Sequence, residues 1–284
     1  MIDASLSLRG QAKRGIVRQV QAVFNDRTRG ERPVERSDDA LFAPDSVIWR
    51  VHGDVTSMMI GGVAALLLQM LHPAVLAGVW DHSNFRTDMM GRLRRTARFI
   101  AVTTYGDRGD ALTSIAKVRH VHGHIGGTLA DGSAYAADDP ALLSWVHVCE
   151  AWCFLAAWQR YGNRRLSAAD EDRYFADFAS IGVALGVDPV PRDKAEAVGV
   201  IEAMRPLLAV DDRTREVARL VLGHKPANPL TMPVQQVTMQ AAVDLLPDWA
   251  RRMHGLPASP LLMRPLVDTA AVGLATTLRW AFAR

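Results

Sequence analysis

Residues 57–80 read SMMIGGVAALLLQMLHPAVLAGVW, and this almost wholly apolar stretch decides the fold class. A membrane-spanning helix needs roughly 20 consecutive apolar residues, so the stretch is long enough to be one. However, Gln69, His72 and Pro73 interrupt it. Because proline removes a backbone donor and restricts the residue before it, we predict a buried core helix, a turn, and a short helix over 73–80. A membrane span is the alternative.

The rest of the sequence also favours helices. Apolar residues make up 49% of the 284 positions and aromatic residues only 7%, so alanine, leucine and valine dominate. Capping and turn signals predict helices over residues 5–28, 46–71, 91–104, 108–125, 140–161, 167–186, 193–207, 212–223 and 232–244, and a terminal helix. No segment alternates like a strand, and 128–140 reads as a loop. We predict an all-α, single multi-helix domain over 45–284, preceded by an N-terminal helical arm and irregular connection over 1–44.

Charge and cysteine content exclude several functions. The chain has 33 Lys+Arg against 30 Asp+Glu, a net charge of +3, and its arginines are scattered, so no nucleic-acid partner is expected. Cys149 and Cys153 are the only cysteines, so there is no disulfide framework. The segment Met1–Val20 has no continuous apolar run, unlike a secretory signal. We expect a cytoplasmic protein.

The C-terminal segment 261–282 is apolar but contains Arg264, Asp268 and Arg279. This pattern predicts an amphipathic helix that either packs on the domain or lies on a membrane surface. The sequence therefore leaves open a peripheral membrane contact, and equally assembly into a homo-oligomer.

Three of the nine histidines stand together in His120-Val-His122-Gly-His124. Helical residues four apart share a face, whereas residues two apart point to roughly opposite sides. We predict that His122 points into the core and that its two neighbours face water. The apolar arc that contains His122 consists of Ala111, Leu112, Ile115, Val118 and Ile125. An ordinary hydrogen-bonded core histidine and a metal ligand both fit His122, while His120 and His124 lack the further ligands of a zinc site.

The predicted helix 91–104 carries four arginines. One face holds Arg92, Arg95, Thr96, Phe99 and Thr103, and Arg94 and Arg98 lie away from it. Arginines on an inward face need anionic partners, such as a cofactor's carboxylates, a substrate carboxylate or buried acidic residues. Alternatively, their guanidinium groups reach water at the edge of the helix.

His147 and Glu150 lie one turn apart in the predicted helix 140–161. A carboxylate and a histidine at this spacing occur in di-iron sites of helical bundles, although no second copy of the motif is present. With His72 or His82 they would form the site of a non-haem metal enzyme. Cys149 and Cys153 share a face of this helix and read as small core residues.

An ordered set of segments then identifies a family. The segments are Val51-His-Gly-Asp54, Leu66-Leu-Leu-Gln-Met-Leu-His-Pro73, Gly78-Val-Trp-Asp-His-Ser83, Gly91-Arg-Leu-Arg-Arg-Thr96, Thr104-Tyr-Gly106, Val118-Arg-His-Val-His122 and Tyr135-Ala-Ala-Asp-Asp-Pro140. Their order and spacing resemble the oxygenase family that includes the latex-clearing protein, a rubber oxygenase, and the mycophenolic-acid pathway oxygenase. The likeness runs from about residue 45 to 160.

The resemblance implies an all-helical fold with a globin-like or bundle-like pocket for haem b. It makes His122 the proximal iron ligand, and it places Arg92, Phe99 and Thr103 with His122 around the cofactor. In the rubber oxygenase an Arg-x-x-Lys-Thr pattern lies over the distal face of the haem. Here Arg92, Arg95 and Thr96 match it, and Arg95 replaces the lysine. Because arginine stays protonated and does not ligate iron as lysine can, an open or water-filled distal site is expected, and rubber-like substrates are not.

The leading hypothesis is therefore a haem-dependent oxygenase that uses dioxygen on an apolar or lipid-like small molecule. Arg92, Arg95 and Thr96 would polarise bound oxygen or orient the substrate. Three alternatives remain: a haem-binding sensor or carrier without turnover, the non-haem metal enzyme, and a membrane-surface protein.

Overall fold

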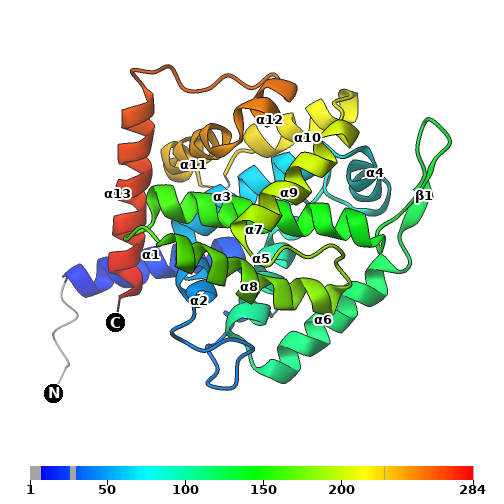
Figure 1. The fold of residues 1–284 in the computed structure, drawn as a ribbon. Coiled ribbons are helices and arrows are strands. Elements are labelled where there is room, and N and C mark those ends of the chain that lie inside the picture. Colours follow the sequence, from blue (N-terminus) through cyan, green and yellow to red (C-terminus); the bar gives the residue numbers. More distant parts are fainter. Residues whose placement is uncertain (1–7, 26–29, 227, 284) are drawn as a thin grey trace.

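The computed structural model describes residues 8–25, 30–226 and 228–283. These residues form one all-α domain with a single short two-stranded sheet, which confirms the predicted fold class (Figure 1). The α-helices are α1 (Leu8–Phe24), α2 (Val47–His52), α3 (Val55–Gln69), α4 (Pro73–His82), α5 (Met89–Tyr105), α6 (Arg108–His122), α7 (Pro140–Tyr161), α8 (Ala168–Leu185), α9 (Lys194–Met204), α10 (Asp212–Leu222), α11 (Met232–Leu245), α12 (Asp248–Met253) and α13 (Arg264–Phe282). Two 3₁₀ segments are Arg205–Leu207 and Pro229–Thr231.

The apolar stretch 57–80 forms a core helix and a short second helix, as predicted. Leu67 and Leu68 of α3 are fully buried. The chain then turns by 105° into α4. The His72 ring caps α4, because its Nδ1 accepts a hydrogen bond from the Ala74 amide at 3.3 Å.

The core is built on α3 and α7, which pack along their lengths (Figure 1). A glycine allows their close approach: a Cβ at Gly61 would lie 2.8 Å from the carbonyl oxygen of Cys153. The ends of α7 lie where the sequence predicts, because the Asp139 carboxylate accepts the first amides and Gly162 ends the helix. Helix α7 is long and apolar enough to cross a membrane, and so is the bent α3–α4 pair if it is counted as one span. However, 67% of the apolar window of α7 is buried within the fold, as in the core helix of a globular domain.

Two strands correct the sequence analysis, which predicted a helix to residue 125 and a loop over 128–140. Helix α6 ends at His122, and β1 (Gly126–Thr128) pairs antiparallel with β2 (Ala134–Ala136). Tyr135 anchors this hairpin, because its buried ring packs on α4 and its hydroxyl donates a hydrogen bond to Asp81 at 3.0 Å.

The two ends of the chain pack together. Helix α13 lies against α1, α3 and α11, with one buried face and one exposed face, so the amphipathic prediction is confirmed (Figure 1). The Lys13 ammonium group on α1 donates a hydrogen bond to the carbonyl oxygen of Ala283 at 2.9 Å. Lys13 and Arg9 also lie over the Trp280 ring. The N-terminal helix is thus a packed part of the fold.

Candidate functional site

Helices α5 and α6 carry most of the predicted site residues and pack against each other. Only Gly106 and Asp107 separate the helices, and the Asp107 side chain caps α6 by accepting a hydrogen bond from the Gly109 amide at 2.9 Å. Arg92 lies in the first turn of α5, and His122 is the last residue of α6. Each residue is therefore at the end of its helix that is remote from this turn.

His122 is the last residue of α6 and is half-buried, whereas His120 and His124 are exposed. It follows Ala111 and Ile115 on the buried face of the helix, as predicted, but the ring lies at the edge of the core and not inside it. Leu112, which the sequence placed on the same buried face, is 50% exposed. Burial lowers the pKa of His122, and the nearby Asp138 carboxylate opposes this shift. A neutral imidazole beside a carboxylate is the form in which histidine binds metals.

Arg92 on α5 is half-buried, and its guanidinium group is desolvated. Burial lowers its pKa to about 10, Arg95 adds to this effect, and the charge of Glu150 opposes it. Within the part of the chain that the structure describes, its guanidinium group has no hydrogen bond or ion pair. A desolvated cation with unused donors is suited to binding the carboxylates of a cofactor or substrate.

Glu150 of α7 faces Arg92, a relation that the sequence did not reveal. Burial raises the pKa of Glu150 to about 7, although a hydrogen bond from Gln69 and the charge of Arg92 both lower it. A carboxyl group that titrates near neutral pH can both donate and accept a proton, and such perturbed groups are frequent in active sites.

The other predicted residues of α5 lie less deeply. Arg95 is exposed, donates a hydrogen bond to the Asn84 side chain at 3.2 Å and forms an ion pair with Asp88 at 3.6 Å. Asp88 also caps α5, so Arg95 fastens the α4–α5 loop to the start of the helix. Thr96 is exposed, and its hydroxyl donates to the Arg92 carbonyl oxygen at 3.4 Å.

Phe99 and Thr103 continue along α5 away from Arg92. Phe99 is half-buried and packs against the main hydrophobic core. Thr103 is buried, and its hydroxyl donates to the carbonyl oxygens of Phe99 and Ile100 at 2.9 and 3.2 Å. The structure thus pairs Arg92 with Glu150 and, separately, His122 with Asp138. Thr103 lies about 16 Å from Arg92 along the axis of α5.

Two valines accompany these polar groups. Val118, one turn before His122, and Val146, one turn before Glu150, are half-buried. Neither side chain belongs to the two hydrophobic clusters that the described residues form. Apolar side chains and a few polar groups are the usual lining of a cofactor site. The His122 imidazole, the Arg92 guanidinium group and these valines have the chemistry that a flat, apolar group with carboxylates would need.

The residues of the non-haem alternative do not converge. His147 stacks on Phe178 of α8 at 4.5 Å between ring centroids, and burial lowers its pKa to about 3. Glu150 instead faces α3 and α5, and the rings of His72 and His82 bond to the Ala74 amide and the Gly126 carbonyl. Among the described residues, no three His, Cys, Asp or Glu side chains are placed to hold a metal ion.

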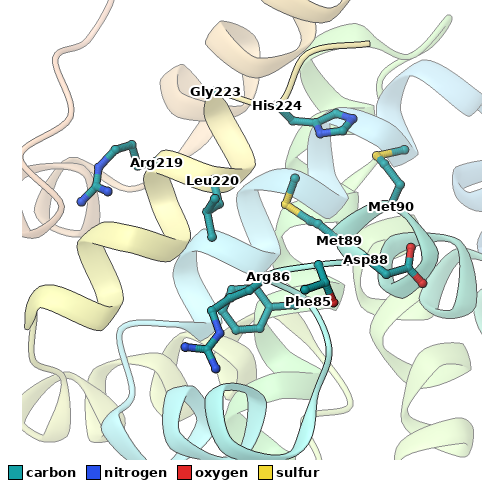
Figure 2. A pocket seen from close by; sticks show the side chains of 10 residues that line it. Phe85, Arg86, Asp88, Met89, Met90, Arg219, Leu220, Gly223 and His224 are labelled. Carbon is teal, nitrogen blue, oxygen red and sulfur yellow. The ribbon is translucent and has the colours of Figure 1, made fainter. Parts of the chain in front are cut away.

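A cavity of about 350 Å³ lies at the start of α5. The α4–α5 loop and the end of α10 line it, and Figure 2 shows the apolar side chains of Phe85, Leu220 and Met89 together with the charged groups of Arg86 and Asp88. Met89 lies three residues before Arg92 and so on the same side of α5. The cavity could not be predicted from the sequence, because Asp88 signals only the start of a helix.

The fold and these residues define a class: an all-α protein with a half-buried imidazole beside a carboxylate and, on the neighbouring helix, an arginine that faces a glutamate. The chain belongs to the family of the ER-bound oxygenase mpaB/B′ and rubber oxygenase catalytic domain, whose sequence model matches residues 49–280. No curated protein and no solved structure matches the chain. The predicted family is thus confirmed. Membership in this oxygenase family implies dioxygen and a small-molecule substrate as reactants.

Proposed function

We propose that this protein is a haem b-dependent oxygenase that acts on an apolar or lipid-like small molecule, with His122 holding the iron. The observation that carries the proposal is the half-buried position of His122, where burial lowers the imidazole pKa next to Asp138. A single partly buried imidazole suits haem, which needs one protein ligand, better than a metal ion that needs three or four.

Other residues of the chain would orient His122, bind a carboxylate, exclude water and transfer a proton. Asp138 would orient the His122 ring, and the unused donors of Arg92 would bind a haem propionate or a substrate carboxylate. Val118, Val146 and Phe99 would exclude water from the pocket. When bound, haem would supply the iron that activates dioxygen. The Glu150 carboxyl group, with a pKa of about 7, would hold or release a proton at the substrate.

Arg95 and Thr96 enter this proposal as positioning residues. Arg95 is held by Asn84 and Asp88, and the Thr96 hydroxyl by the Arg92 carbonyl oxygen. They would fix the start of α5 and therefore the direction of the Arg92 guanidinium. The cavity beside Met89, which apolar and charged side chains line together, would admit the substrate.

The absorption spectrum of the purified protein tests haem binding. We expect a Soret band in the wild type, its loss in His122→Ala, and its retention in His120→Ala. His120 is the matched control, because it lies on the same helix end but is exposed. A folded wild-type protein that never takes up haem would refute the proposal, as would a His122→Ala variant with an unchanged spectrum.

Oxygen consumption separates an oxygenase from a haem-binding sensor or carrier. Haem-loaded protein, given an external reductant and a panel of unsaturated fatty acids and terpenes, should consume dioxygen with at least one of them. Arg92→Gln should keep the Soret band but lose most of this consumption. A Soret band without turnover on any member of the panel would instead support the sensor.

A further inference from the structure

A second cavity, of about 360 Å³, lies away from His122, where the start of α2 meets the second half of α7 and the last helix, α13. Trp49 and Arg50 of α2, Trp158 of α7 and Arg279 of α13 contribute to its wall. Trp158 lies eight residues after Glu150, about 12 Å along α7. This cavity is therefore separate from the proposed haem pocket, and its volume is within the range of small-molecule sites.

Three polar groups of the residues that line this cavity have no hydrogen-bond partner. They are the indole N–H groups of Trp49 and Trp158 and the hydroxyl of Ser46, all buried among the described residues. Trp49 is 7% exposed and Trp158 only 3%. A buried donor without a partner is costly, and three such groups among the residues of one cavity indicate that a ligand supplies acceptors there.

The charges at the cavity favour an anion. Asp54 is neutralised, because its carboxylate pairs with the Arg279 guanidinium at 2.5 Å and caps α3 at the Ser57 amide. Arg36 lies over the rings of Trp49 and Tyr105. Arg50 is exposed and has no hydrogen bond or ion pair with any residue that the structure describes. Arg36 and Arg50 therefore leave a positive charge that the one remaining carboxylate, Asp45, does not balance.

We propose that this cavity binds a small molecule carrying a carboxylate or phosphate group, a site distinct from the haem pocket. Arg50 and Arg36 would pair with the oxyanion at the mouth. The Trp49 and Trp158 indoles and the Ser46 hydroxyl would donate hydrogen bonds to its oxygens after small rotations of their side chains, since neighbouring atoms cover them in this conformation. The faces of the two indoles would pack against the apolar part of the ligand.

Titration calorimetry of the full chain with inorganic phosphate and with benzoate tests the site. We expect saturable binding of one or both probes. Phosphate as the tighter probe would identify a phosphoryl ligand, and benzoate a carboxylate. Arg50→Gln should weaken binding about tenfold, the effect of losing one charge-assisted hydrogen bond. Arg252→Gln, an exposed arginine on the equally short α12, is the matched control and should leave binding unchanged.

Trp49→Phe and Trp158→Phe test the buried donors, because phenylalanine keeps an aromatic ring but has no N–H group. Each should weaken binding a few-fold, and the double variant more. The proposal is overturned if neither probe binds, if Arg50→Gln and Arg252→Gln behave alike, or if both tryptophan variants bind like the wild type. Calorimetry needs no turnover and His122→Ala should bind as the wild type does, so the outcome is independent of the haem proposal.

Discussion

Glu150→Gln should change stability in a pH-dependent way, because the Glu150 carboxyl group is buried opposite Arg92. Glutamine has nearly the shape of the protonated acid but cannot ionise. Burial raises the pKa of Glu150 from 4.5 to about 7 in the folded protein. The folded state therefore keeps this proton in a pH range where the unfolded chain has already lost it.

The magnitude follows from this shift. When the folded state binds more protons than the unfolded state, the free energy of unfolding falls as pH rises. For Glu150 the fall lies between pH 4.5 and about 7, and above that range it is complete. At about 1.4 kcal/mol per pKa unit, Glu150 lowers the free energy of unfolding of the wild type by about 3 kcal/mol at neutral to alkaline pH. The free energy of unfolding of Glu150→Gln does not fall in this way, because glutamine does not ionise.

Urea denaturation of both proteins at a series of pH values measures the effect. The free-energy difference between Glu150→Gln and wild type should be close to zero near pH 4.5 and rise to about 3 kcal/mol by about pH 8, since all other titrating groups cancel. Glu216→Gln, a half-buried glutamate of α10, is the control and should show no such rise. A pH-independent difference for Glu150→Gln would show that its carboxyl group is not desolvated, and the argument for the site would fail.

Three further substitutions probe the fold by urea denaturation. Asp54→Asn leaves the Arg279 guanidinium without its carboxylate and should cost about 3 kcal/mol; a loss below about 1 kcal/mol would mean that the pair is solvated. Gly61→Ala should cost about 2–3 kcal/mol, because the new Cβ would lie 2.8 Å from a backbone oxygen of α7 that has no room to move. Gly199→Ala on α9 should instead stabilise by about 0.5–1 kcal/mol, because nothing lies within 4 Å of its Cβ position and alanine favours the helix. Equal effects of the two glycine substitutions would contradict the close approach of α3 and α7.

Helix positions could be predicted where the signals are local. Helix α7 begins and ends as predicted, because Asp139, Pro140 and Gly162 act within a few residues of its ends. The β1–β2 hairpin could not be predicted in the same way. Its strands have only three residues each, and what holds them is the packing of Tyr135 on α4, a contact between distant parts of the sequence. The pair Gly126-Gly127 therefore reads as the stop of a helix.

The candidate site also contains features that local sequence rules predict and features that depend on tertiary packing. The direction of His122 could be predicted because helical periodicity depends only on sequence spacing. Its partner Asp138 could not, because the hairpin between them decides that they meet. Glu150 was noticed for its spacing from His147, but tertiary packing turns the two side chains toward different helices. Helical periodicity thus predicts the direction of a side chain from its helix, but it does not predict the tertiary contacts of that side chain.

Arg95, which replaces the lysine of the rubber oxygenase pattern, has a structural role at the start of α5. The Arg95 side chain is exposed, and its guanidinium group binds Asn84 and Asp88, two residues of the loop that precedes α5. One turn earlier, Arg92 is half-buried and lacks a hydrogen-bond partner among the described residues, with Glu150 opposite. We propose that Arg92 is the cation that binds the carboxylate of the cofactor or substrate and that Arg95 holds Arg92 in place. Asn84→Ala should then reduce oxygen consumption while leaving the Soret band intact, whereas Arg92→Gln should abolish most turnover. Equal activity of Asn84→Ala and wild type would remove Arg95 from this role.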